Sequence, residues 1–199
     1  MKQAKTLDKQ EIRRVLDHIS TRKHAARNRA MLLMTHLAGM RVGEVAALRW
    51  GDVLNSTGQI KNEIRLSADQ TKGNDTRTVV ISERLQKELA VYVKSQKVRD
   101  MTHSFFYTQK QQRRGFTANT LAQHFYHLYK AAGIDGASSH SGRRSLLTNL
   151  GSKGVTLTQV AETYGTSTLQ IEKRTTTQQK QRSLLMLCHS LNTNTGMDC

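Results

Sequence analysis

Four side chains that could act on a phosphate are spread along the chain, and the first of them is Arg41. It stands in a turn between two predicted helices, because Gly39 is placed for a left-handed C-terminal cap and Glu44 falls in the first turn of the next segment. A guanidinium held by backbone on both sides can present a pre-positioned fork of donors to an oxyanion. A solvated arginine in a surface loop is the alternative that this stretch leaves open.

The other three side chains are Lys72, His140 and Arg143. His140 and Arg143 are three positions apart, so on a helical turn they share one face and can converge on one ligand. They lie near a predicted helix N-terminus, where free backbone amides favour an anion. Lys72 sits just before the tip of a predicted hairpin, where a long amine could reach a groove. A lysine that keeps a sheet edge soluble would fit that position as well.

The charge of the chain indicates the class of partner. Lysine and arginine number 31 against 15 acids in 199 residues, which gives a net charge of +16. Such a field favours a polyanion, with nucleic acid as the leading candidate, although a ribosomal or membrane-surface protein would share it. The sequence has no apolar run of about 18 residues and no secretory signal pattern. We therefore expect a cytoplasmic protein.

The sequence does not favour a metal or a disulfide framework. Its two cysteines, Cys188 and Cys199, both lie near the end of the chain. The histidines at positions 124 and 127 have helical spacing but no nearby cysteine or carboxylate to complete a metal site. A solvated or stacking role is the better interpretation of that pair, and no cofactor is predicted.

Helices make up most of the elements that must position these side chains. Apolar residues recur at helical spacing in five segments before the C-terminal region, and residues suited to helix caps flank several of them. The expected N-caps are Thr6, Ser82 and Thr117, and Gly133 is expected to close the helix that Thr117 opens. At this length the chain is most simply one domain, or one domain with an arm.

After residue 59 the spacing of the apolar residues changes from the helical repeat to the two-residue repeat of β-strands. Alternating positions predict two strands around a turn at residues 73–75, with Ile64, Leu66 and Ala68 on the first strand and Thr76, Thr78 and Val80 on the second. The fold class is therefore α+β, mainly helical, with one small antiparallel β-hairpin.

The stretch from Gly39 to Trp50 resembles the first arginine box of the tyrosine recombinases, the phage integrase family. That box reads Gly-x-Arg-x-[Ser/Gly]-Glu-[Leu/Val]-x-x-Leu-x-Trp, and its positions here are Gly39, Arg41, Gly43, Glu44, Val45, Leu48 and Trp50. The stretch from Ser139 to Leu150 is similar to the second box, and a hairpin lysine stands between the two, as in the family. The ordered set covers most of the chain.

The resemblance implies a tyrosine-recombinase catalytic domain over residues 1–181, of the small single-domain type. Residues 182–199 would be a C-terminal helix or tail, which either docks onto a neighbouring subunit or packs within its own chain. The implied partner is double-stranded DNA, bound by a homo-oligomer or by this chain paired with an active recombinase. The implied location is the bacterial cytoplasm or nucleoid.

The resemblance also implies a reaction. A tyrosine would attack a DNA phosphodiester to give a 3′-phosphotyrosyl link and a free 5′-hydroxyl, without a metal or other cofactor. Arg41 and Arg143 would neutralise the transition state, and His140 would assist by hydrogen bonding or proton transfer. Lys72 would protonate the departing 5′-oxygen. Glu44 would orient a neighbouring base.

Two positions depart from the family pattern. Thr166 stands where the family has a second histidine or a tryptophan, and Thr175 stands where it has the tyrosine nucleophile. Tyr164 lies eleven positions before the nucleophile position, too far for the geometry of transfer. A threonine hydroxyl is a weak nucleophile without an adjacent base and a poorer leaving group than phenolate.

Three interpretations follow from the sequence. The first is a site-specific DNA recombinase by descent, impaired unless another tyrosine serves in trans. The second is a cleavage-defective DNA-binding relative that occupies recombination sites. The third is a basic RNA- or ribosome-binding protein. The order of Arg41, Lys72, His140 and Arg143 argues against the third, because generic polyanion binding needs charge but no such order.

Overall fold

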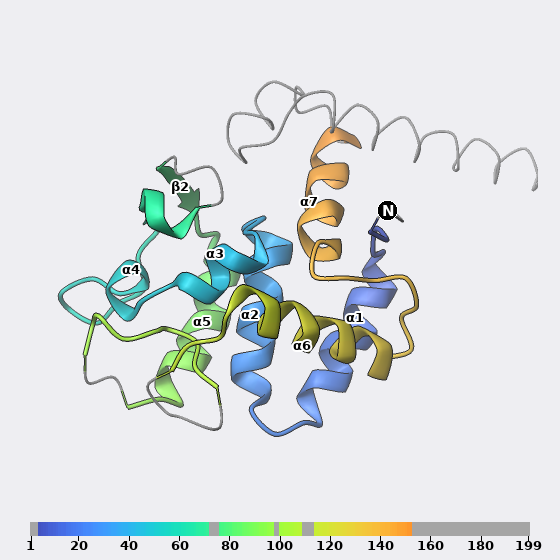
Figure 1. Ribbon diagram of the computed structural model, residues 1–199, viewed down its shortest axis with the longest axis horizontal. Helices are drawn as coiled ribbons and strands as arrows, with labels where there is room; N and C mark the ends of the chain where they lie inside the picture. The colour runs from blue at the N-terminus through green and yellow to red at the C-terminus, as the bar shows by residue number, and fades with distance from the viewer. Residues whose placement is uncertain (1–3, 72–75, 98–99, 109–113, 153–199) are drawn as a thin grey trace, which may run out of the picture. The chain divides into compact units, whose positions relative to one another are not determined.

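The computed structural model describes residues 4–71, 76–97, 100–108 and 114–152 (Figure 1). The chain divides into two compact units, Met1–Leu146 and Leu147–Cys199, and the contacts below lie within the first. The described residues are mainly helical and contain one two-stranded antiparallel sheet, so the expected fold class is confirmed. The predicted boundary at residue 182 lies outside the described residues.

Helix α2 (Ala25–Leu37) is the central helix of the first unit and packs against α1 (Lys9–Ser20), α3 (Val42–Ala47) and α5 (Glu83–Lys94) (Figure 1). Met31, Leu33 and Met34 of α2 are almost completely buried. Arg29 of α2 donates two hydrogen bonds of 2.6 Å to the carboxylate of Glu88 on α5. The helix that leads to the first arginine is therefore held by packing along most of its surface.

The start of α1 differs from the prediction. Asp8, and not Thr6, is the N-cap: its carboxylate accepts a 2.7 Å hydrogen bond from the backbone N–H of Glu11, and Glu11 accepts one from the N–H of Asp8. Aspartate followed three positions later by glutamate forms a reciprocal capping box, and this outcompetes a threonine two residues upstream. Thr6 instead accepts a 3.2 Å hydrogen bond from Nε of Arg144.

Several of the other predicted helix ends are confirmed. Gly39 has φ +62°, the left-handed conformation expected after α2. Ser82 accepts a hydrogen bond from the N–H of Leu85 at the start of α5, and Thr117 does the same for Thr120 at the start of α6 (Ala118–Ala131). These ends were predictable because each depends on a side chain and a backbone group a few positions apart.

The hairpin forms, but the second strand is turned over relative to the prediction. β1 (Glu63–Leu66) pairs with β2 (Arg77–Val80) in the register Ile64↔Val79, and these two side chains are buried together. Val80 is 70% exposed. Residues 79–81 are a continuous apolar run, so alternation could not decide which face is buried. The first strand is also shorter than predicted, because Ala68 begins the 3₁₀ helix η1 (Ala68–Gln70).

An aromatic cluster fixes the segment that follows α3. Trp50 opens the short helix α4 (Trp50–Val53), and its ring lies 4.7 Å edge-on from that of Phe105. The hydroxyl of Tyr92 on α5 donates to the carbonyl of Phe105 at 2.8 Å. Two backbone hydrogen bonds, from Phe105 to Leu48 and from Trp50 to His103, join the same segments. The tryptophan of the first box is thus a core residue.

His124 lies beside aromatic rings, but its ring is tilted relative to theirs and does not stack on them. Its ring centroid lies 5.9 Å from that of Phe116, and its pKa is lowered to about 4 by burial and then by the charges of Arg27 and His127. In the part of the chain that the structure describes, no group of His, Cys, Asp and Glu side chains could hold a metal ion. In that same part, no helix is long and apolar enough to cross a membrane.

Candidate active site

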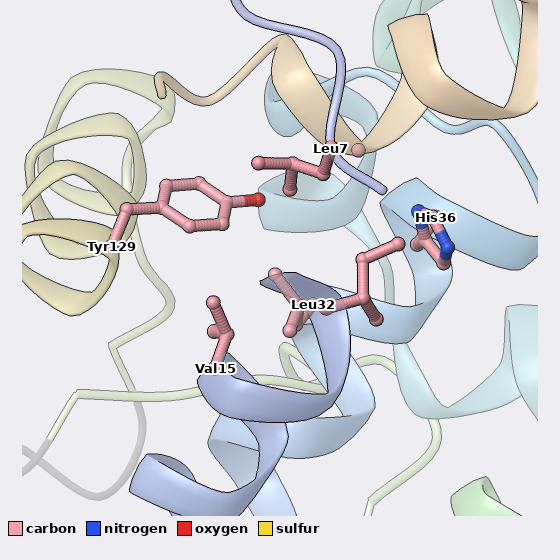
Figure 2. Close-up of a pocket in the computed structure, with 7 residues that line it drawn as sticks. Leu7, Val15, Leu32, His36 and Tyr129 are labelled. Carbon is pink, nitrogen blue, oxygen red and sulfur yellow. The ribbon is translucent and has the colours of Figure 1, made fainter. Parts of the chain in front are cut away.

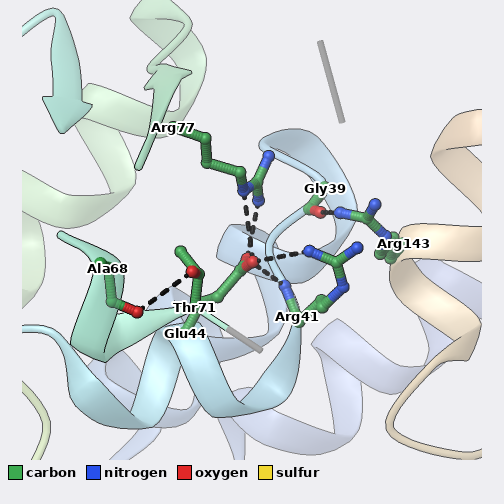
Figure 3. A network of polar contacts seen from close by, with 7 residues as sticks. All are labelled: Gly39, Arg41, Glu44, Ala68, Thr71, Arg77 and Arg143. Atoms are coloured by element: carbon green, nitrogen blue, oxygen red, sulfur yellow. Dashed lines mark hydrogen bonds and ion pairs between the residues drawn. The ribbon is translucent and has the colours of Figure 1, made fainter. Parts of the chain in front are cut away.

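Arg41 is the residue immediately before α3 and has extended backbone, with φ −74° and ψ 151°. Its backbone N–H donates to Oε2 of Glu44 at 2.7 Å, and its Nη1 donates to Oε1 of the same carboxylate at 3.0 Å (Figure 3). The Arg41 side chain is 30% exposed. The first box therefore holds this guanidinium from within its own turn and leaves part of it at the surface.

Glu44 is buried, with only 1% of its side chain exposed, and it joins two arginines. Arg77 of β2 approaches from the other side of the carboxylate, with Nε donating to Oε1 at 3.2 Å and Nη2 donating to Oε2 at 2.7 Å (Figure 3). Burial acts to raise the pKa of Glu44, but the hydrogen bonds and charges of Arg77 and Arg41 outweigh it and lower the pKa below its ordinary value. Glu44 is therefore ionised at neutral pH.

Arg143 reaches the same turn from α7 (Ser141–Ser152). Its Nη1 donates to the backbone carbonyl of Gly39, a residue 104 positions earlier in the chain (Figure 3). The side chain is buried. The left-handed conformation of Gly39 follows the end of α2. The two arginine boxes consequently meet at one turn, with Arg41 two residues after the carbonyl that Arg143 binds.

The N-terminus of α7 is fixed by short polar contacts. Ser145 donates to the carbonyl of Ser141 at 2.8 Å and accepts a 2.7 Å hydrogen bond from the N–H of Leu7. His140 directly precedes the helix, is exposed, and accepts a hydrogen bond from the N–H of Arg144 on its carbonyl oxygen. The start of α7 is thereby held to the N-terminal segment of the chain.

A narrow gap, too small to hold a water molecule, lies beside these contacts. It is lined mainly by apolar side chains, among them Leu7, Val15 and Leu32, together with Gly142 of α7 (Figure 2). The hydroxyl of Tyr129 and Nδ1 of His36 also face this region, and neither has a hydrogen-bond partner among the described residues. Burial lowers the pKa of His36, which favours the neutral ring.

Gly142 is required where α7 crosses α2. A Cβ atom at this position would meet Thr35 of α2, at 3.2 Å from its Cβ and closer still to its hydroxyl. We expect Gly142→Ala to destabilise the protein by about 1–3 kcal/mol, because an overpacked contact outweighs the gain in helix propensity. The free energy of unfolding in urea measures this.

Gly43→Ala is the matched control for that substitution. Gly43 is also the second residue of a helix, but a Cβ there would meet only Ala118, at an ordinary 3.7 Å. Gly43→Ala should therefore be neutral or stabilising. Equal stability of the two variants would show that α7 can move away from Thr35 without cost.

The structure brings Arg41, Glu44 and Arg143 together and places His140 at the start of the helix that carries Arg143. Lys72, Thr166 and Thr175 lie outside the described residues. Sequence reasoning missed Arg77. The strand register could have found it, because Arg77 pairs with Leu66, which is fully buried, and an arginine on that face of the hairpin needs a buried acid.

Comparison with known proteins identifies the family of this chain. The model of the phage integrase family matches residues 5–182, which is most of the chain. The chain therefore belongs to the phage integrase family. Among curated proteins, no sequence matches it significantly.

Solved structures share the fold. XerA recombinase superposes with a TM-score of 0.70 at 22% identity, over 88% of this chain and 61% of that one. The Tn1549 transposon integrase in complex with transposon right end DNA gives 0.65 at 15% identity, over 92% and 67%. A λ integrase dimer bound to a COC′ core site gives 0.64 at 14% identity, over 88% and 60%. The chain thus spans about three fifths of XerA, and these likenesses establish the tyrosine-recombinase catalytic fold.

Proposed function

We propose that this chain acts in site-specific DNA recombination or integration, through a tyrosine-recombinase catalytic domain that binds duplex DNA at a phosphodiester. We further propose that its own strand cleavage is impaired, because Thr175 occupies the nucleophile position. One observation carries the proposal: the guanidinium of Arg143 binds the turn that presents Arg41. Family membership supports the same function.

The charges at this turn suit a phosphate. Arg41 and Arg77 bind one carboxylate, that of Glu44, and Arg143 binds the carbonyl of Gly39 in the same turn (Figure 3). Three positive charges and one negative charge leave two positive charges at this turn. In a phosphoryl transfer the transition state concentrates negative charge on the non-bridging oxygens, and donors fixed in advance stabilise it most. Arg41 and Arg143 come from distant segments and are suited to meet those oxygens from different sides.

The remaining roles are proposed from the resemblance and from chemistry. His140 would assist by hydrogen bonding or proton transfer near neutral pH, and Lys72 would protonate the 5′-oxygen. Residues 1–181 would form the catalytic domain, and residues 182–199 a tail that docks onto a neighbouring subunit. The λ integrase dimer on its core site supports assembly as a homo-oligomer on DNA. Pairing of this chain with an active recombinase is the alternative assembly.

A second candidate function is favoured by the two threonines. If no tyrosine serves in trans, the arginine site would hold a phosphate without cutting it, and the chain would be a cleavage-defective relative that occupies recombination sites. The net charge of +16 supports DNA binding in either case.

Both functions are tested with duplex DNA. We expect 30-bp duplexes of randomised sequence to form a retarded complex with the wild-type chain, and the logarithm of the affinity to fall linearly with the logarithm of salt concentration. Duplexes enriched by repeated selection, each given a single nick, then serve as suicide substrates. We expect no protein–DNA adduct that survives SDS.

The possible results separate the alternatives. An SDS-resistant adduct would show that the wild-type chain cleaves DNA and would overturn the proposed impairment. A 30-nucleotide RNA that outcompetes the duplex at every salt concentration would overturn DNA as the partner and favour an RNA-binding protein. A complex without an adduct supports occupancy of DNA sites without cleavage.

A further inference from the structure

We infer that Arg77 is a positioning residue for the proposed phosphate site, which acts by holding Glu44 so that Glu44 in turn holds Arg41. The inference rests on the proposed function, because it assigns to Arg77 an effect on how Arg41 meets DNA. Arg77 itself is 13% exposed and bound to a buried carboxylate, so it is poorly placed to bind DNA directly.

The carboxylate of Glu44 is shared in a symmetric way. Each of its oxygens accepts one hydrogen bond from Arg77, and each accepts one from Arg41, through the backbone N–H and through Nη1. Four charge-assisted or backbone hydrogen bonds leave the carboxylate little freedom to rotate. Without Arg77, the carboxylate would keep only its two hydrogen bonds from Arg41. The carboxylate could then rotate together with the Arg41 side chain.

The second effect of Arg77 is electrostatic. A single buried Glu44–Arg41 pair would be neutral, and the carboxylate would compete with a phosphate for the same guanidinium. Arg77 supplies a second positive charge to the same carboxylate, at N···O distances of 2.7 and 3.2 Å. Arg41, which is the more exposed of the two, can then direct donors outward to an anion.

The position of Arg77 in the fold explains how the β-hairpin can affect the position of Glu44. Arg77 is the first residue of β2 and pairs with the buried Leu66 of β1, so the backbone of the hairpin fixes where its guanidinium begins. The β-hairpin is thereby tied to the turn between α2 and α3. Arginine is needed at this position because its two parallel donors match both carboxylate oxygens, whereas lysine offers a point charge.

The test compares Arg77→Met with Arg29→Met. Arg29 also donates two hydrogen bonds to a glutamate, Glu88, but this pair joins α2 to α5. Arg29→Met therefore removes one positive charge and one ion pair, as Arg77→Met does. We expect Arg77→Met to weaken binding to the 30-bp duplex about tenfold and to reduce the salt slope by about one phosphate contact. Arg29→Met should leave the slope unchanged.

A double-mutant comparison decides whether Arg77 acts through Arg41. We expect the single variant Arg41→Met and the double variant Arg41→Met with Arg77→Met to bind the duplex with equal affinity. The reason is that Arg77 can have no effect through Arg41 once the Arg41 guanidinium has been removed. Arg77→Lys should recover part of the affinity, and it carries the test if Arg77→Met does not fold by circular dichroism. An Arg77→Met effect of full size in the Arg41→Met background would overturn the inference.

A measurement without DNA separates this inference from the proposed function. The backbone N–H of Arg41 donates to Glu44, so its NMR chemical shift and its hydrogen exchange report the geometry of the carboxylate directly. We expect Arg77→Met to shift this resonance and accelerate its exchange, and Arg29→Met to do neither. An unchanged resonance in folded Arg77→Met would overturn the inference. Failure of the wild-type chain to bind duplex DNA would overturn the proposed function, while this resonance would still decide the role of Arg77.

Discussion

Strand cleavage should appear when Thr175→Tyr is combined with Thr166→His. A phenolate is both a better attacking group and a better leaving group than a threonine alkoxide, and the histidine supplies the donor that the family places in that turn. Loss of a nucleophile typically lowers turnover by several orders of magnitude, on the order of 10⁴- to 10⁶-fold. The nicked suicide duplex should therefore give an SDS-resistant adduct with the double variant, where the wild-type chain gives none.

Thr175→Phe with Thr166→His is the control for that experiment. It differs from the active variant by one hydroxyl group, so an adduct formed by both would show that cleavage uses another residue. Thr175→Tyr alone measures how much the histidine contributes. A double variant that folds and retards the duplex but forms no adduct would show that more than these two positions is defective.

Glu44→Ala should be among the most destabilising substitutions in the described part of the chain. It removes the carboxylate that lies between Arg41 and Arg77, and the largely buried Arg77 would keep its charge without this partner. Removing one partner of a buried ion pair typically costs about 3–5 kcal/mol. Urea unfolding at pH 7 measures the loss. Glu88→Ala, which breaks a more exposed pair, should cost about 1 kcal/mol or less.

The contribution of Glu44 should also depend on pH, and the sign follows from its lowered pKa. The folded state binds a proton more weakly than the unfolded state, so stability is gained above the ordinary pKa of 4.5 and lost as the pH falls through the folded value. The difference in unfolding free energy between the wild-type chain and Glu44→Gln should therefore shrink below about pH 4.5. A difference that stays constant from pH 7 to pH 3 would show that the carboxylate is not held as a charge.

The sequence predicted those parts of the fold that depend on neighbouring residues. The cap at Ser82, the cap at Thr117 and the left-handed Gly39 each depend on groups within one helical turn, and all three are confirmed. The two family boxes likewise pointed to Arg41 and Arg143, because the order of the boxes along the chain can be read from the sequence alone.

The parts that the sequence did not predict depend on long-range packing. The buried face of β2 was ambiguous because residues 79–81 are all apolar, and only the pairing of Ile64 with Val79 decides it. Arg77 was overlooked because its partner is 33 positions away. The close approach of Gly142 to Thr35 has no local pattern, since it arises from the crossing of two helices.

The hydrogen bond from Arg143 to Gly39 has a consequence for biosynthesis. The ribosome synthesises Gly39 early, but Arg143, whose guanidinium binds the Gly39 carbonyl, is added 104 residues later. Ser145, which accepts a hydrogen bond from the N–H of Leu7, is added 138 residues after Leu7. A contact of such long range cannot form before the intervening chain has been synthesised. A nascent chain therefore carries Arg41 without Arg143, and the two arginines can meet at the Gly39 turn only when translation has passed Arg143.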